Sequence, residues 1–142
     1  MSMITENVAQ IRSRIAAAAR AAGRDPADIR LCAATKMNDS AAVREAIAAG
    51  VDCCGENRVQ ELVKKLDEHA YDGAPVHFIG ALQRNKVRQV VGQVDVIESV
   101  DRRELLADIN AEAAKRGIVQ DILLEINAGG EKQKSGFLLK EF

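Results

Sequence analysis

Short apolar runs alternate with segments of helical periodicity along nearly all of the 142-residue chain. Residues 4–15 repeat apolar side chains at spacings of four, three and four, which predicts one buried face of a helix. Five short apolar runs follow, each separated from the next by a helical pattern: 29–35, 51–55, 76–79, 94–97 and 122–126. Strands that alternate with helices form right-handed β–α–β units, so the chain is expected to build a parallel sheet.

Local signals mark the ends of the intervening helices. Gly23 ends the first helix, and Asp39 or Ser40 can cap the second. Asp101 and Glu104 have the spacing of a capping box at the start of the helix that Gly117 ends. Two further helices are expected around residues 59–66 and 82–92.

Two α/β architectures can accommodate this order, an open doubly wound sheet and a (β/α) barrel. The dinucleotide fingerprint G-x-G-x-x-G is absent, which weakens the doubly wound alternative. A TIM-type barrel needs eight strands and about 250 residues. The sequence therefore predicts an α/β fold of the (β/α) TIM-barrel type. We expect a single partial barrel domain over residues 1–142, with the N-terminal five of eight strands and a truncated C-terminal portion.

Charge and hydropathy exclude several classes of function. The 20 basic and 21 acidic residues give a net charge of -1, whereas nucleic-acid binders carry a basic excess. There is no apolar run of about 20 residues to span a membrane, and the N-terminus does not resemble a signal peptide. We therefore expect a cytoplasmic protein that binds neither nucleic acid nor membrane.

The three cysteines do not have the pattern of a disulfide framework or a metal site. Cys53 and Cys54 are adjacent, Cys32 is distant from them, and no C-x-x-C spacing occurs. Each cysteine falls within a short apolar run, so all three are expected to be small buried core residues, with no bound metal.

Polar residues gather where the predicted strands end. In parallel α/β folds the functional site lies at the C-terminal ends of the strands. The residues that follow the five runs are Lys36, Glu56 with Asn57, 83–86, Ser99 with Asp101, and Asn127. Loops are polar in any fold, so it is the convergence of five strand ends that favours a site at one mouth.

Lys36 is the most informative of these strand-end residues. Side chains alternate along a strand, so a Lys36 that points into a barrel has Cys32 and Ala34 as inward neighbours, while Ala33 and Thr35 meet the helices. Small neighbours leave space for a ring. Loss of hydration there lowers a lysine pKa, and a neutral amine condenses with an aldehyde to a Schiff base. The alternative is a strand-end lysine that reaches into solvent.

Three other features allow two interpretations each. His77, near the start of its strand, is either a hydrogen-bonded core histidine or a site residue. The basic residues 83–88 suit an anion or partner site, or a solvated helix start. The lysines of the loop 131–136 either swing over the mouth or have no role.

Several longer motifs carry a family resemblance. They are Thr35-Lys36, G-E-N-R-V-Q-E at residues 55–61, H-F-I-G-A-L-Q-R-N-K at 77–86, Ser-Val-Asp at 99–101 and Lys-Ser-Gly-Phe at 134–137. In this order they resemble the pyridoxal phosphate homeostasis proteins, which share the barrel of the alanine racemase N-terminal domain. The resemblance covers nearly the whole chain.

The resemblance implies a cofactor and a set of residues that bind it. Lys36 falls at the position that holds pyridoxal 5'-phosphate (PLP) as a Schiff base, Asn57 lies beside the cofactor, and Lys134 is a second, looser candidate. With positions on the third and fourth strands, the candidate cofactor-binding set is Lys36, Asn57, His77, Ile79, Ser99 and Lys134. Family members are thought to carry and buffer PLP without substrate turnover, and PLP-dependent apo-enzymes are candidate recipients.

The chain departs from the family pattern in two respects. Met37-Asn38 replaces the usual continuation after the lysine. The groups that bind the phosphate and face the pyridine nitrogen in the family lie beyond residue 142. Losing two or three charge-assisted hydrogen bonds of about 1.5–3 kcal/mol each lowers affinity by roughly three decades or more. We therefore expect this chain to bind PLP far more weakly than an intact family member.

Two other functions remain open at this level. One is a racemase-like or decarboxylase-like PLP enzyme, which needs a second domain and an opposing acid or base. The single tyrosine, Tyr71, falls in the loop before the third strand and suits that role poorly. The other is a non-binding partial-barrel scaffold that self-associates through its open edges.

Overall fold

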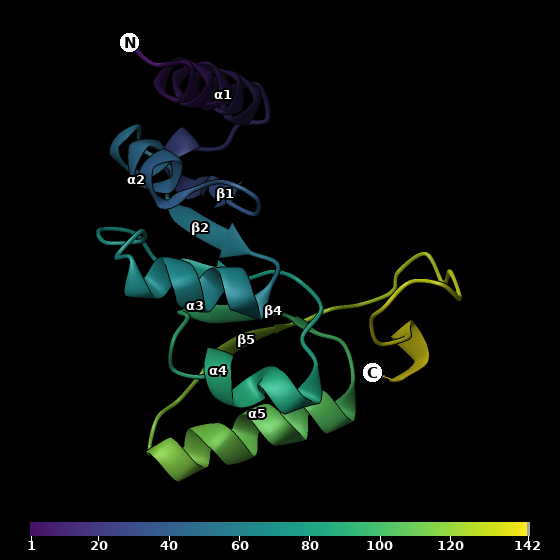
Figure 1. Ribbon diagram of the computed structural model, residues 1–142. Helices are drawn as coiled ribbons and strands as arrows, with labels where there is room; N and C mark the ends of the chain where they lie inside the picture. Colours follow the sequence, from purple (N-terminus) through teal and green to yellow (C-terminus); the bar gives the residue numbers. More distant parts are fainter. Residues whose placement is uncertain (142) are drawn as a thin grey trace.

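The structure is a computed structural model that describes residues 1–141 (Figure 1). Its centre is one parallel sheet with the strand order β1-β2-β3-β4-β5. The strands are β1 (Cys32–Ala34), β2 (Cys53–Glu56), β3 (Val76–Phe78), β4 (Val96–Val100) and β5 (Asp121–Leu124). The predicted parallel sheet of five strands is confirmed.

The strand order separates the two architectures that the sequence allows. A doubly wound sheet reverses its order at a switch point and carries helices on both faces. Here each strand lies beside its neighbour in sequence, which is the arrangement of consecutive strands in a (β/α) barrel. The structure therefore has the arrangement of the first five strands of a barrel, with β1 and β5 at the two edges.

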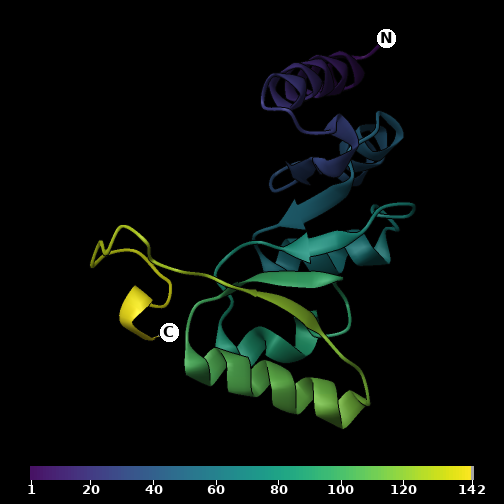
Figure 2. The ribbon, with the colours of Figure 1, turned by 180° about the vertical axis from the view of Figure 1, so that it is seen from behind.

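The helices form one layer on one face of the sheet. They are α1 (Met3–Ala21), α2 (Ser40–Ala48), α3 (Val59–Asp67), α4 (Val87–Val90) and α5 (Arg103–Arg116), with short 3-10 turns at Pro26–Asp28, Arg84–Lys86 and Leu139–Glu141. α1 packs on α2 beyond the β1 edge (Figure 1). Seen from behind, the other face of the sheet has no helix of residues 1–141 over it (Figure 2). In a closed barrel that face would line the interior.

The hydrophobic core lies between the sheet and the helices. Cys54, Phe78 and Ile97, at 0% exposure, project from the central strands onto the helix layer. Leu62 of α3 and Leu105 of α5 meet them from the helices and are equally buried. Aliphatic side chains supply most of this core because the chain has few aromatic residues.

Most helix boundaries follow the local signals. The Asp39 carboxylate accepts the Ala42 N–H at 2.8 Å and caps α2, and Gly117 ends α5 in the left-handed conformation with φ 66°. The predicted capping box of the last helix is wrong. Its N-cap is Arg102, without a side-chain cap, because the Asp101 carboxylate instead accepts a bond from the Arg102 guanidinium at 2.5 Å.

Two other expectations need correction. The predicted helix at 82–92 shrinks to a 3-10 turn and the four residues of α4, with buried Leu82 preceding them in a loop. Cys53 and Cys54 are buried as expected, but Cys32 is exposed. The neighbouring Ala33 packs against the core, so Cys32 lies on the opposite face of the sheet, and burial within an apolar run depends on which face the side chain takes.

Candidate functional site at the strand ends

The C-terminal ends of the first three strands are bonded to one another. Beyond β1, the Thr35 N–H donates to the Gly55 carbonyl at 2.9 Å, and the Ile79 N–H donates to the Glu56 carbonyl at 2.8 Å. Lys36 and Asn57 each come one residue after a strand end held in this way. The structure therefore brings the ends that carry Lys36, Asn57 and Ile79 into adjacent positions.

Lys36 follows the strand alternation predicted for it. Ala33 packs against the core and Thr35 is buried, whereas Cys32, Ala34 and Lys36 are exposed. Within residues 1–141 the Lys36 amine makes no hydrogen bond or ion pair. The expected loss of hydration is not found, because the sheet face beside Lys36 is open.

Asn57 sits in a crowded backbone turn at the end of β2. A Cβ on Gly80 would lie 2.2 Å from the Asn57 carbonyl oxygen, so only glycine allows the loops after β2 and β3 to approach so closely. The side-chain Oδ1 of Asn57 is buried and has no hydrogen-bond partner within residues 1–141. Buried polar atoms are normally satisfied, so Asn57 Oδ1 is an exception within the described part of the chain.

A charged network lies directly beneath these strand ends. The carboxylate of Glu56, the residue before Asn57, is 0% exposed and accepts bonds from Lys65, Thr35 and Tyr71 through Oε1. Burial and the adjacent Glu56 carboxylate raise the pKa of Tyr71. Sequence reasoning noted Glu56 only as a strand-end polar residue and did not include Lys65. One signal could have found Lys65: it lies three residues after buried Leu62, on the same face of α3.

The open face of the sheet carries His77, Ile79 and Cys32. His77 Nδ1 lies 2.6 Å from Glu98 Oε1, so the histidine has a partner on the neighbouring strand. A Cβ on Gly55 would lie 2.7 Å from Ile79 Cδ1 and 3.1 Å from Cys32 Sγ, which places both side chains over Gly55. Desolvation of the sulfur and a side-chain hydrogen bond with Cys53 raise the pKa of Cys32 to about 12, so this thiol stays protonated at neutral pH.

The remaining candidates do not gather beside Lys36. Ser99 is buried within β4, and its hydroxyl has no hydrogen-bond partner in the described part of the chain. Lys134 is exposed in the loop that follows β5, the opposite edge strand from β1. Four strand spacings separate these edges by roughly 19 Å along the sheet. The structure thus brings Lys36, Asn57 and Ile79 together and leaves Lys134 apart.

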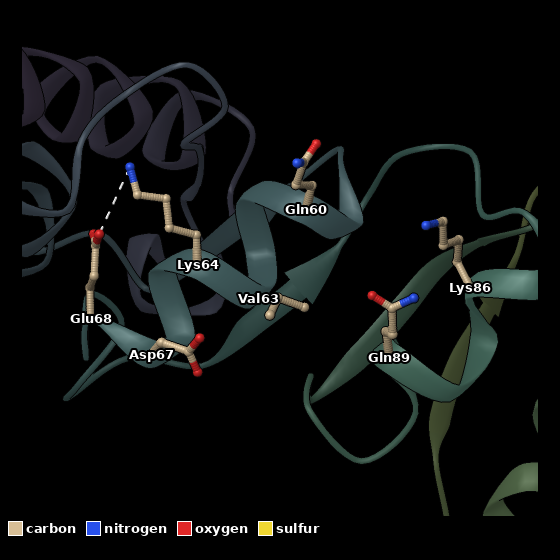
Figure 3. A pocket seen from close by; sticks show the side chains of 7 residues that line it. All are labelled: Gln60, Val63, Lys64, Asp67, Glu68, Lys86 and Gln89. Carbon is tan, nitrogen blue, oxygen red and sulfur yellow. Dashed lines mark ion pairs between the residues drawn. The ribbon is translucent and has the colours of Figure 1, made fainter.

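A separate groove of about 690 Å³ lies between α3 and α4, on the helix side (Figure 3). Polar and charged residues line it together with Val63, and Lys64 pairs there with Glu68 at 3.8 Å. None of the six candidate residues lines this groove.

Across residues 1–141 there is no cluster of three or more potential metal ligands. The helices of this part of the chain are also too short or too polar to cross a membrane.

A sequentially ordered parallel sheet, with a free lysine at the end of its first strand, defines a barrel-type (β/α) domain with its site at the strand ends. The chain belongs to the alanine racemase N-terminal domain family, which matches residues 6–142. Curated relatives named pyridoxal phosphate homeostasis protein are 40% identical in Aquifex aeolicus and 41% identical in Pseudomonas aeruginosa, over 92% and 96% of this chain. The resemblance inferred from the motifs is therefore confirmed.

Solved structures agree with this assignment. A protein from Bifidobacterium adolescentis is 42% identical and superposes with a TM-score of 0.87, covering 94% of this chain and 58% of its own. PipY of Synechococcus elongatus, in a structure with PLP bound, is 32% identical with a TM-score of 0.79 and covers 95% of this chain and 58% of its own. The chain also spans 58% and 59% of the two curated relatives.

Proposed function

We propose that this protein carries PLP on Lys36 and serves intracellular PLP homeostasis without turning over a substrate. The observation that carries the proposal is the exposed, unpaired amine of Lys36 at the bonded ends of β1 and β2. Support comes from relatives named for PLP homeostasis and from PipY, whose structure has PLP bound. PLP-dependent apo-enzymes are the proposed recipients of the cofactor.

The residues at the mouth suit the chemistry of this cofactor. PLP supplies an aldehyde with which an unprotonated lysine amine condenses, with release of one water molecule. In this chain Lys36 would supply the amine, and Asn57, which follows the end of β2, would lie beside the cofactor. Ile79 offers an apolar contact over Gly55. His77, Ser99 and Lys134 stay as further candidate cofactor-binding residues.

The structure offers little support for a racemase-like or decarboxylase-like enzyme. Such chemistry needs an acid or base that reaches the reacting atoms at the mouth. The single tyrosine is 5% exposed, and its hydroxyl donates to Glu56 at 3.0 Å beneath the strand ends. Tyr71 is thus committed to the buried network, which favours a carrier over a catalyst.

Reductive trapping tests the proposal. Incubation with PLP followed by borohydride reduction and peptide mass mapping should place the label mainly on Lys36, and Lys36→Ala should lose it. Lys65 should react poorly because its amine is buried among three acceptors. The matched control Lys134→Ala should keep the label on Lys36. Label found mainly on Lys64 or Lys65, or no specific label, would contradict the proposal and favour a non-binding scaffold.

A further inference from the structure

The charged network beneath the mouth reaches the backbone on both sides of Lys36. Glu56 is its centre, since one carboxylate oxygen accepts from Lys65 Nζ at 2.5 Å, Thr35 Oγ1 at 2.6 Å and the Tyr71 hydroxyl at 3.0 Å. Its other oxygen is buried without a partner within residues 1–141. A buried ion pair is weak support for stability in itself, because desolvation offsets much of the attraction.

Lys65 joins the network to the residue before Lys36. Its side chain is 5% exposed, and besides Glu56 its amine donates to the Thr35 carbonyl at 2.7 Å. The same amine forms an ion pair with Glu61 Oε2 at 3.5 Å. Thr35 is thus held twice, through its hydroxyl by Glu56 and through its carbonyl by Lys65.

Glu61 holds the residue after Lys36. Its Oε2 accepts the Met37 N–H at 2.8 Å, and Met37 has a left-handed backbone with φ 62°. Non-glycine residues rarely adopt this conformation, so an external contact is needed to maintain it. The Asn38 side chain also donates to the Lys36 carbonyl at 3.0 Å. The chain therefore turns sharply just after Lys36, and Glu61 of α3 fixes the turn.

We propose that Glu56, Lys65 and Glu61 form a positioning clamp that holds the backbone on both sides of Lys36, so that its amine is presented at the mouth. The inference rests on the proposed function, since it assigns these residues to the attachment of PLP at Lys36. The clamp leaves the Lys36 side chain itself free and fixes only its main-chain neighbours. A fixed strand end raises the rate of a condensation by reducing the orientational freedom lost when the amine meets the aldehyde.

The Glu61 variants separate positioning from overall stability. Glu61→Ala removes the acceptor of the Met37 N–H, whereas Glu61→Gln keeps an oxygen that can accept it. We expect Glu61→Ala to slow borohydride-trapped PLP labelling of Lys36 about tenfold, the equivalent of losing one hydrogen bond of ~1.4 kcal/mol. Glu61→Gln should retain most of the rate. Amide hydrogen exchange at Met37, measured without PLP, should accelerate in Glu61→Ala and remain slow in the wild type.

Adjacent lysines of α3 supply a matched control. Lys65→Met should slow labelling and destabilise the chain, because it leaves Glu56 buried without its cation. Lys64→Met, one residue away and largely exposed, should leave both unchanged. If Lys65→Met does not fold, the two Glu61 variants still decide the question.

Two results would overturn the clamp, and a third would remove the proposed function with it. The clamp fails if wild-type and Glu61→Ala chains label Lys36 at equal rates. It also fails if the Met37 amide exchanges in the wild type as fast as an unprotected amide. If the wild-type chain acquires no borohydride-trapped PLP on Lys36, the result contradicts both the proposed function and the presentation of Lys36 to the aldehyde. That outcome differs from the first two because the wild-type chain itself then carries no label on Lys36.

Discussion

Two lysines on consecutive β–α units show how environment decides what one residue type can do. Lys36 is exposed at a strand end with no partner for its amine within residues 1–141. Lys65 is buried and directs its amine at Glu56, Thr35 and Glu61. An amine must be accessible to react with an aldehyde, so the first lysine suits covalent attachment and the second suits a structural charge.

The pKa of Glu61 leads to a prediction for pH dependence. The Met37 N–H, which donates to this carboxylate, holds the pKa of Glu61 below its ordinary value of 4.5. A lowered carboxyl pKa adds to the free energy of unfolding above the ordinary value, and that contribution is lost as pH falls through the lowered pKa. The wild type should therefore lose its stability advantage over Glu61→Gln as pH decreases below about 4.5.

Urea unfolding of both chains over a pH series measures this effect. The other acidic residues are common to the two chains, so the difference in unfolding free energy isolates Glu61. A difference that stays constant from neutral pH down to about pH 3 would show that the Glu61 carboxylate makes no such contribution.

At the scale of elements, the strand ends are held by close backbone approaches as well as by ladder bonds. Gly80 follows β3 and lies against Asn57, which follows β2, with no room for a side chain between them. The Ile79 N–H bonds the Glu56 carbonyl next to this contact. The adjacency of the two strand ends therefore depends on the absence of a Cβ at residue 80.

Gly80→Ala should lower the free energy of unfolding by about 1–3 kcal/mol, because forced overpacking has costs in this range. Its Cβ would meet the Asn57 backbone at 2.2 Å, and a backbone atom cannot move aside as a flexible side chain can. Gly129→Ala is the control, since its nearest neighbour would be the Glu131 side chain at 3.7 Å. It should change stability by no more than about 0.5 kcal/mol. Equal urea midpoints for the two variants would show that the close approach of Gly80 to the Asn57 backbone does not limit the size of the residue at position 80.

The whole molecule presents an open sheet face and two free edges. Helices cover one face of the sheet (Figure 2). Leu123, at 55% exposure, and Cys32 are neighbours of Ile122 and Ala33, which pack against the core, so both lie on the other face. Edge strands with unpaired backbone groups beside an apolar face promote pairing with other chains.

We therefore predict concentration-dependent self-association of this 142-residue chain. Leu123→Lys, which places a charge on the open face of the β5 edge, should shift sedimentation toward the monomer. Met3→Lys is the matched control, because Met3 is exposed and apolar but lies on α1. A chain that sediments as a monomer at all concentrations, or that responds equally to both changes, would contradict this prediction.

Periodicity alone predicted the order of the elements, the parallel sheet and the position of Lys36 after the first strand. These features depend on local spacing, because alternation along a strand and the 3.6-residue helical repeat decide which residues share a face. The alternation also predicted correctly that Thr35 is buried and that Cys32 and Ala34 lie on the opposite face from Ala33. The motifs predicted the family.

Packing between distant elements decided what periodicity could not. The bonds of the network of Thr35, Glu56, Lys65 and Tyr71 join residues up to 30 positions apart, so no local pattern specifies it. The exposure of Cys32 and Lys36 depends on whether anything covers one face of the sheet, and the failed Asp101 cap depends on competition from Arg102. The sequence by itself determined which residues line each element. Only the tertiary structure decided which of them are buried, charged and paired, because burial and pairing depend on neighbours distant along the chain.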